Sequence, residues 1–510
     1  MKRLHQKSPT PAMASSSFFL LHDRESEKRR LFFCLIKRRS FNSDEDEGFP
    51  RGYLILRPEE LRPLELLRLL FSNDIEKPRL VNSSETKEPS FRRRWFIFVS
   101  LVLLKLLQFL SEPLALFGSA LEFSLNFLSD NSFSRFFLRG EVVMPKTTSD
   151  NYLSFIGHLD RRISLDKTKS REDGDLYYAA LSIMSSKLAY ENSARIKYVV
   201  ENHWHMKYLG LDDYWNEYQE KETTQAFMMS TDQEKTVVVA FRGTEPFNSE
   251  DWCSDFDITW YELPNIGRIH GGFIMKALGL QNNCSWPKKP LPNPNRLSPL
   301  AYYSIRDSLK ALIAHDEQTK FVLTGHSLGG ALAILFTAVL VIHDETELLE
   351  RLQGVYTYGQ PRVGDSTFGE FMEKKLEEND VKYYRFVYNN DIVPRLPYDD
   401  KDLMFKHFGT CIYYDRHYQP KILRDESDEN YFSLWGIIKR MYNAVLEFIR
   451  SFTITREKGS EFEEGWLLKL ARALGIILPG ISNHTPQDYV NVTRLSPSFV
   501  FQIHRDVALT

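Results

Sequence analysis

From about residue 151 onward, short apolar runs alternate with longer segments whose apolar residues recur at helical spacing. The strand-like runs are β-branched or aromatic and four to eight residues long, which is typical of buried strands. They are Gln225–Met229, Thr236–Phe241, Lys320–Thr324, Val355–Tyr358 and Tyr383–Tyr388. The helix-like segments are Asp175–Tyr190, Ser304–Ala314 and Ala331–Ile342. Strands alternating with helices predict an α/β domain with a mostly parallel central sheet.

A second pattern covers residues 95–128, which are almost entirely apolar. Lys105 is the charged residue of Trp95–Leu110 and Glu122 that of Leu114–Leu128, and Pro113 lies between these two stretches. A spanning helix needs about 20 apolar residues, so one half is short for a span and the whole is long. Two half-length helices around Pro113 would suit a hairpin that enters one leaflet and returns. A single span and a buried pair of core helices remain as alternatives.

These patterns divide the chain into three parts. Residues 1–94 are polar and basic, with a short amphipathic helix predicted around Leu61–Phe71. Residues 95–128 are the predicted membrane or lipid-droplet anchor, preceded by an arginine triplet that is typical of an interfacial boundary. Residues 151–510 form the predicted catalytic domain. Within it, residues 415–478 hold two further apolar, helix-compatible stretches, which indicate a helical insertion.

The composition argues against a nucleic-acid-binding protein, a zinc protein and a disulfide-rich protein. The 510 residues carry a formal net charge of −3, so no general attraction to nucleic acid is expected. The four cysteines are scattered without a CxxC pair, which predicts neither a zinc site nor a disulfide framework. No ordinary signal peptide is expected at the start of the chain. The aromatic share of 13% suits apolar ligands or membranes.

The strongest chemical signal is Gly325-His326-Ser327-Leu328-Gly329, which follows an apolar strand and precedes an apolar helix. In this context G-x-S-x-G is a nucleophile elbow, in which the serine sits on a strained turn and its hydroxyl stands clear of the sheet. The two glycines leave room for the neighbouring strand and helix. Ser327 is therefore the candidate nucleophile of an acyl hydrolase with the α/β-hydrolase fold.

A nucleophilic serine needs a base, and the base needs an orienting acid, in the chain order serine, acid, histidine. Asp391 is favoured as the acid because it follows the strand-like Tyr383–Tyr388. The competing acids are Asp365, Asp399 and Asp400. His484 is favoured as the base over His407, the alternative that the spacing leaves open. The two further histidines after Asp391 are His417 and His504.

An oxyanion hole needs two backbone N–H donors. One is expected from Leu328, the residue after the serine. The run Thr236–Phe241 ends in Arg242-Gly243-Thr244, so the N–H of Thr244 is the natural second donor. No metal or organic cofactor is needed for this chemistry.

At these residues the chain closely resembles the class 3 lipases. The matching stretches, in family order, are Phe241–Thr244, His270–Phe273, the elbow, Tyr358–Gly364 and Asn390–Pro394. The resemblance implies Asp391 and His484 as the acid and base, and Thr244 and Leu328 as oxyanion donors. It also implies a lid helix at Glu250–Asp255, with Trp252 as a lid aromatic.

The apolar segment and the long insertion make the whole chain similar to the plant oil-body lipases. That resemblance implies hydrolysis of tri-, di- and monoacylglycerols at the surface of a lipid droplet, reached in one route through the endoplasmic reticulum. A phospholipase A1 or galactolipase of the same fold is the alternative enzyme. A non-catalytic lipase-fold scaffold is the alternative of another class, and it is disfavoured because all three triad residues are present.

Overall fold

The computed structural model describes residues 52–496 with gaps. The described ranges are 52–58, 66, 69–71, 81–84, 90–131, 142–166, 174–216, 221–231, 235–273, 278–279, 286–290, 292–293, 296–397, 405–423, 431, 433–454, 462 and 464–496. Most of the predicted N-terminal region, residues 1–94, and most of the helix predicted around residues 61–71 lie outside them. So do Asp399, Asp400 and His504.

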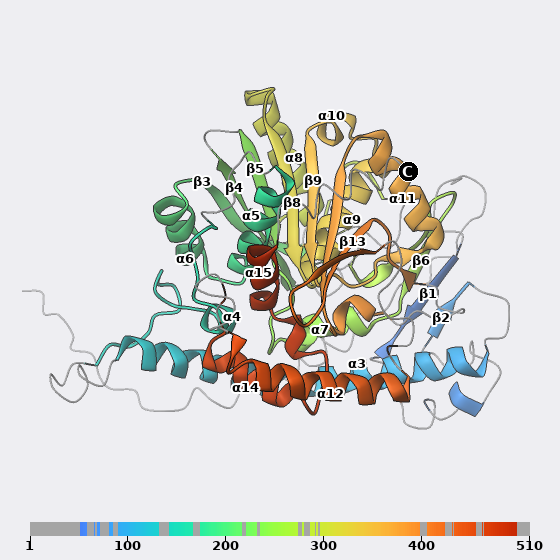
Figure 1. Ribbon diagram of the computed structural model, residues 1–510. Coiled ribbons are helices and arrows are strands. Elements are labelled where there is room, and N and C mark those ends of the chain that lie inside the picture. The colour runs from blue at the N-terminus through green and yellow to red at the C-terminus, as the bar shows by residue number, and fades with distance from the viewer. Residues whose placement is uncertain are drawn as a thin grey trace, which may run out of the picture. The chain divides into compact units, whose positions relative to one another are not determined.

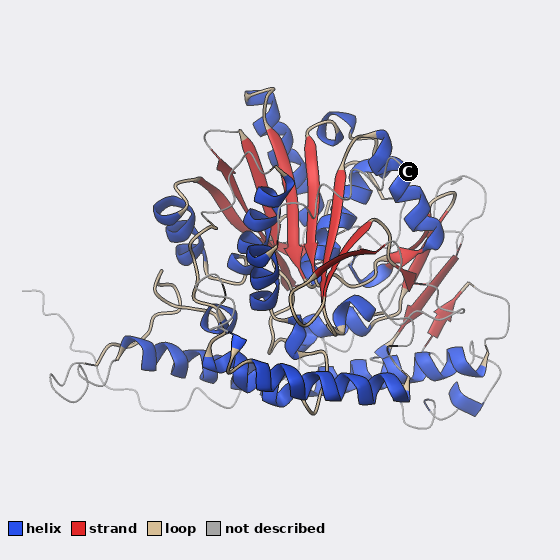
Figure 2. Cartoon of the chain, in the orientation of Figure 1, coloured by secondary structure: helices blue, strands red, loops and turns tan. Residues whose placement is uncertain are grey.

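An eight-stranded sheet forms the centre of the domain (Figures 1 and 2). Its spatial order is β14-β13-β11-β9-β8-β5-β4-β3. The five strands β13, β11, β9, β8 and β5 pair in parallel, whereas β14, β4 and β3 pair antiparallel at the two sides. The prediction of a mostly parallel sheet therefore holds for the centre, and the sheet as a whole is mixed. The strands are β3 Lys207–Asn216, β4 Lys221–Thr231, β5 Thr236–Phe241, β8 Lys320–His326, β9 Leu352–Tyr358, β11 Lys382–Tyr388, β13 Thr410–Tyr414 and β14 Pro420–Leu423.

Helices cover both faces of this sheet, which is why its central strands are apolar throughout rather than alternating. On β5, Val237, Val239 and Phe241 pack into one core with α8, α9 and α11. Val238 and Ala240 point the other way, into a core shared with α5 and α15. The helices are α5 Asp175–Leu188, α6 Ser193–Tyr198, α8 Ala301–His315, α9 Leu328–Ile342, α10 Thr346–Leu349, α11 Ser366–Glu378 and α15 Pro486–Leu495, with the π-helical turn η4 Val199–His203.

A second sheet, which the sequence pattern did not predict, collects short strands from distant parts of the chain. Its order is β12-β10-β7-β6-β1-β2, and every pairing in it is antiparallel. The strands are β1 Gly52–Leu56, β2 Val81–Ser83, β6 Trp260–Leu263, β7 Gly267–His270, β10 Gly364–Asp365 and β12 Phe405–Lys406. Strands this short carry too few residues for a clear period of two, so only tertiary pairing reveals them.

The apolar segment is one continuous helix, α3 Phe91–Asp130. The Ser90 side chain accepts from the Arg93 N–H at its start, and Pro113 lies inside it without ending it. The hairpin of two half-length helices is therefore wrong. α3 is long and apolar enough to cross a membrane, but it also packs against the domain, chiefly on α7 Ser249–Phe256 and on α4 Phe155–Leu159.

Contacts with the domain on both sides of Pro113 explain the continuous helix. Ser100 Oγ donates to the Phe256 carbonyl at 2.6 Å, before the proline. Asn126 Nδ2 donates to the Leu153 carbonyl at 2.8 Å, after it. Proline removes one helical hydrogen bond, and these tertiary contacts hold the two halves in line.

The insertion at residues 415–478 begins with the edge strand β14 and continues into α12 Leu434–Arg450 and α14 Trp466–Gly475. In Figure 1 the two helices run along the edge of the domain that α3 also occupies. Arg472 of α14 attaches them to the core. Its fully buried guanidinium pairs with Glu464 and, at 2.8 Å, with Asp488 of α15.

Removing the positive charge should loosen the insertion. We expect Arg472→Met to lower the free energy of unfolding by about 3–5 kcal/mol, because the carboxylates of Glu447, Glu464 and Asp488 would stay buried without this partner. Urea unfolding followed by circular dichroism measures this. Lys439→Met, which removes an exposed cation from α12, should change stability by less than about 0.5 kcal/mol. Equal losses in the two variants would contradict the assignment.

Candidate active site

Ser327 lies at a sharp turn between β8 and α9. Its backbone angles are φ 59° and ψ −131°, in the left-handed half of the map that side chains rarely adopt. A Cβ on Gly325 would lie 2.1 Å from the Gly329 carbonyl carbon, and one on Gly329 would lie 2.3 Å from the Phe241 carbonyl oxygen. Glycine is thus required at both positions, because neighbouring backbone atoms of the strand, turn and helix occupy the space that a Cβ would need.

The structure brings Ser327, His484 and Asp391 into one hydrogen-bonded chain. Nε2 of His484 lies 2.7 Å from the Ser327 hydroxyl, and Nδ1 lies 2.8 Å from Oδ2 of Asp391. An ionised carboxylate can only accept, so Nδ1 carries the proton and Nε2 is free to accept from the serine. All three side chains are buried.

Two loops at the carboxyl edge of the sheet hold the acid and the histidine. Asp391 follows β11 and precedes the short 3₁₀ turn η6 Val393–Arg395, whereas His484 ends the turn η7 Ser482–His484. Asp391 Oδ1 also accepts from the Val393 N–H at 2.9 Å. This bond fixes the carboxylate on its own loop while the histidine approaches from the other.

Tyr489 of α15 is a site residue that sequence reasoning did not single out. Its hydroxyl donates to Oδ2 of Asp391 at 2.5 Å. Burial, together with the nearby Asp391 charge, raises the pKa of Tyr489 well above its usual value, so the phenol stays protonated and keeps donating. Its position five residues after His484, on the first turns of a helix, was the available signal.

His326, inside the elbow, is the second residue that was missed. Its ring centroid lies 4.6 Å from that of His484, and its Nδ1 lies 2.9 Å from the Tyr190 hydroxyl. Burial first, and then repulsion from His484, lower the pKa of His326 well below its usual value. An uncharged ring therefore packs beside His484.

The two predicted oxyanion donors lie at the same edge of the sheet. β5 and β8 pair in parallel with Phe241 opposite Gly325, and Thr244 and Leu328 each follow three residues later. Both residues are buried. Leu328 is the first residue of α9, so its N–H has no partner within the helix.

The predicted lid residue, Trp252, lies on α7 close to the triad. Its ring centroid is 6.3 Å from that of His484, edge to face, and its Nε1 donates to the Pro246 carbonyl at 3.3 Å. α7 is fastened to α3 on its other side, where Ser249 Oγ donates to the Leu107 carbonyl at 2.7 Å. The lid-like helix thus lies between the site and the apolar helix.

The described alternatives have other partners. Asp365 caps α11, where Oδ1 accepts from the Phe368 N–H at 2.9 Å. His407 Nε2 donates to the Pro394 carbonyl at 2.7 Å. His417 bonds to its neighbour Arg416. Within the described residues, no group of three or more histidine, cysteine or acidic side chains could hold a metal ion.

Comparison with known proteins agrees on one family. The family model described as lipase (class 3) matches residues 238–401. The chain is 40% identical to triacylglycerol lipase OBL1 of Nicotiana tabacum, over 79% of this chain and 83% of that protein. It is 39% identical to triacylglycerol lipase OBL1 of Arabidopsis thaliana, over 90% and 98% of the two chains. A solved Rhizomucor miehei lipase propeptide complex shares 23% identity over 51% of this chain and 74% of that chain, at a TM-score of 0.37.

Gly359 lies directly against Asp391 and His484, so a substitution there would show how closely the site is packed. Its φ is +59°, and a Cβ would lie 2.9 Å from Oδ2 of Asp391 and 3.0 Å from Cε1 of His484. We expect Gly359→Ala to displace this pair and slow fluorophosphonate labelling of Ser327 by roughly 100-fold, the cost of about 1 Å of misplacement. The labelling rate is read from gel fluorescence against time.

Gly174→Ala is the matched control. Gly174 has nearly the same φ, +57°, but a Cβ there meets nothing within 4 Å. This variant carries the backbone strain, about 1–3 kcal/mol, without the collision. Labelling slowed equally in both variants would show that strain, and not contact with the triad, is the cause.

Proposed function

The chain belongs to the class 3 lipase family and is a lipase, and from this we propose that it hydrolyses the ester bonds of acylglycerols with Ser327 as a covalent nucleophile. The observation that carries the proposal is the hydrogen-bonded chain from Ser327 through His484 to Asp391. A scaffold without activity would not need this chain buried and complete.

The proposed reaction has two acyl-transfer steps. His484 Nε2 takes the Ser327 proton as Oγ attacks the acyl carbonyl carbon, and the π electrons move to the carbonyl oxygen. The tetrahedral intermediate collapses, the ester C–O bond breaks, and His484 gives its proton to the leaving alcohol. Water, deprotonated by His484, then attacks the acyl-enzyme and releases the fatty acid and Ser327. Asp391 stabilises the imidazolium in both steps.

The oxyanion formed in each step would be stabilised by the N–H groups of Thr244 and Leu328. Both follow parallel neighbouring strands, and the N-terminus of α9 adds the positive end of its dipole. In a comparable hydrolase, removal of one donor costs about 2.7–4 kcal/mol of transition-state stabilisation. Trp252 would cover the site as a lid aromatic.

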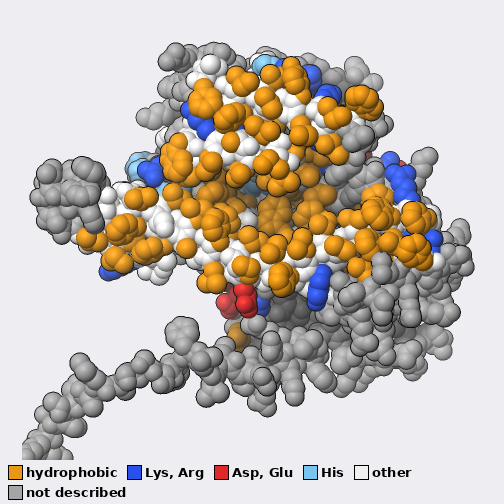
Figure 3. Space-filling view, turned by 90° about the horizontal axis from the view of Figure 1, so that it is seen from below, with side chains coloured by type: hydrophobic (Ala, Val, Ile, Leu, Met, Phe, Trp, Pro, Cys, Tyr) orange, Lys and Arg blue, Asp and Glu red, His pale blue; other side chains and the backbone are white. Residues whose placement is uncertain are grey.

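Access to an insoluble substrate would come from an exposed apolar face on α3, α12 and α14. Seen from below, hydrophobic side chains spread over this side of the molecule with few charges among them (Figure 3). Prominent exposed members are Phe109, Leu116, Leu128, Trp435, Ile438, Ile449, Trp466, Leu470 and Leu474. Large exposed apolar patches mark surfaces that meet a membrane or another protein. We propose that it rests on a lipid droplet or membrane surface.

The triad can be tested directly. We expect Ser327→Ala and His484→Ala to lower kcat on p-nitrophenyl butyrate by roughly 10⁶-fold, as in a serine hydrolase that loses either residue. His407→Gln, at the alternative histidine, should keep kcat within about two-fold. Activity retained in Ser327→Ala, with unchanged circular dichroism, would overturn the proposed nucleophile.

Head-group preference needs a separate measurement. Purified enzyme given triolein, diolein, monoolein, phosphatidylcholine and galactolipid emulsions should release oleate fastest from the acylglycerols. Faster release from phosphatidylcholine or galactolipid would favour the phospholipase A1 or galactolipase alternative.

The apolar face can be tested by placing charges on it. Ile438→Asp combined with Ile449→Asp should weaken binding to phospholipid-coated triolein droplets by at least about 10-fold for each site, because burying one such side chain contributes about 1.5–3 kcal/mol. Flotation of the droplets measures the bound fraction. Leu297→Asp changes an even more exposed aliphatic residue outside the three helices and should not alter binding. Unchanged flotation of the double variant would refute the face.

A further inference from the structure

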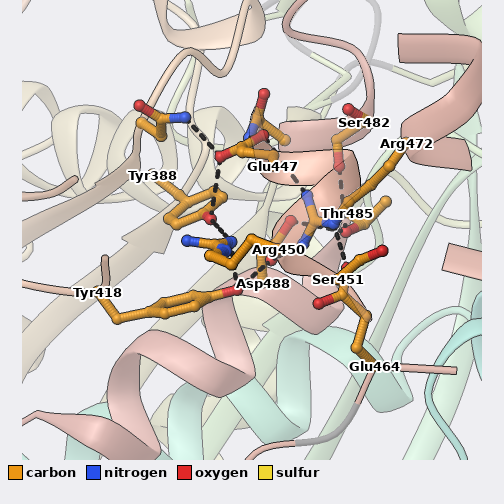
Figure 4. Close-up of polar contacts among 12 residues, drawn as sticks. Tyr388, Tyr418, Glu447, Arg450, Ser451, Glu464, Arg472, Ser482, Thr485 and Asp488 are labelled. Carbon is orange, nitrogen blue, oxygen red and sulfur yellow. Dashed lines mark hydrogen bonds and ion pairs between the residues drawn. The ribbon is translucent and has the colours of Figure 1, made fainter. Parts of the chain in front are cut away.

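The insertion turns a polar face inward, opposite to its apolar one. On α12 the exposed residues Trp435, Ile438 and Ile449 lie on one side of the helix. The buried residues on the other side are Arg440, Ala444 and Glu447, at the i, i+4, i+7 spacing of a single stripe. Figure 4 shows the cluster that this stripe enters, in which Glu447 lies among side chains from α14, α15 and the end of β11.

The Glu447 carboxylate has a donor from each of the two loops that carry Asp391 and His484. Its Oε1 accepts from Asn389 Nδ2 at 2.6 Å and from the Tyr388 hydroxyl at 3.2 Å. Its Oε2 accepts from Asn483 Nδ2 at 2.8 Å. The Glu447 side chain is 1% exposed. One buried group from the insertion therefore bridges both loops.

The bridged residues are neighbours of the triad in the chain. Asn483 immediately precedes His484 in the turn η7. Asn389 lies two residues before Asp391, at φ 40°, where the chain turns sharply after β11. Movement of either asparagine by a fraction of an ångström would move the acid or the histidine with it, since one or two peptide units separate them.

The charge on Glu447 has a chemical reason. A carboxylate can accept all three hydrogen bonds, whereas an amide of the same shape would turn an N–H₂ group toward one of the donors. Arg472 offsets the buried charge, with Nη1 3.6 Å from Oε2, and it pairs in turn with Asp488. The network is therefore built to keep an ionised acceptor between the two loops.

We propose that Glu447 is a positioning residue, through which the insertion sets the Asp391–His484 distance and hence the reactivity of Ser327. This inference rests on the proposed function, because it needs those three residues to be the catalytic ones. It gives the insertion a second role. The helix whose outer side we propose to meet lipid holds the catalytic loops with its inner side.

The test is Glu447→Gln, measured on p-nitrophenyl butyrate, which is water-soluble and needs no lipid surface. We expect kcat for each fluorophosphonate-titrated active site to fall about 10- to 100-fold, with KM changed by less than two-fold. Titration separates the two effects. A variant that is merely less stable has fewer active sites but an unchanged kcat for each.

Asn483→Ala removes the donor on the histidine loop and leaves Glu447 in place, so it serves if Glu447→Gln folds poorly. The double variant should lose less than the product of the two single losses, because both act through one contact. Glu377→Gln, the same chemical change at an exposed site on α11, should leave kcat unchanged.

Full kcat for each titrated site in both Glu447→Gln and Asn483→Ala would overturn the inference while the proposed function stands. Multiplicative losses in the double variant would also overturn it, because independent effects are not a bridge. Activity that survives in Ser327→Ala would instead overturn the proposed function itself.

Discussion

The hydrogen bond between Asp391 and His484 is the constraint on which the site depends. The two residues are 93 positions apart in the chain and meet at 2.8 Å, with both side chains buried. Their loops end at the same edge of the sheet, Gly359 leaves the space for the pair, and Tyr489 donates a further hydrogen bond to the Asp391 carboxylate. Glu447 of α12 accepts hydrogen bonds from Asn389 and Asn483 and so connects the two loops. A low local dielectric strengthens each of these bonds and makes the loss of any one costly.

A second constraint comes from the solvent. The chain buries an arginine and several carboxylates under α12 and α14 while it exposes large apolar side chains on their outer sides. For a protein surrounded only by water this arrangement would be unfavourable on both counts. Contact between the outer side and lipid would remove the cost of the exposed apolar side chains. The polar side chains of the same helices must then face the protein interior. The same helices thus separate a dry polar interior from an apolar exterior.

The apolar helix α3 illustrates how tertiary contacts overrule a local signal. Pro113 and the length of residues 95–128 are compatible with two half-length helices as well as with a single span. The structure instead has one helix that lies along α7 and α4, with bonds to the domain before and after the proline. α3 contacts the lid-like helix α7, which itself lies beside His484. The apolar helix is therefore only one helix away from the site. Hydropathy alone cannot report such contacts, because they depend on residues 27 to 156 positions away in the chain.

The sequence by itself determined the elements whose signals are local. Strand β5, helix α9 and the elbow around Ser327 follow from short-range periodicity and glycine sterics. The chain order of a serine triad favours Asp391 as the acid and leaves His484 and His407 as the candidate bases, and the resemblance to the class 3 lipases implies His484. The tertiary structure decided what depends on distant partners. These features are the antiparallel edges of the sheet, the second sheet, the continuous α3, and the places of Tyr489, His326 and Glu447 beside Ser327, His484 and Asp391. The physical reason is that the sequence gives the type of each side chain at its own position. The hydrogen-bond partner of that side chain depends on which distant segments of the chain pack against it.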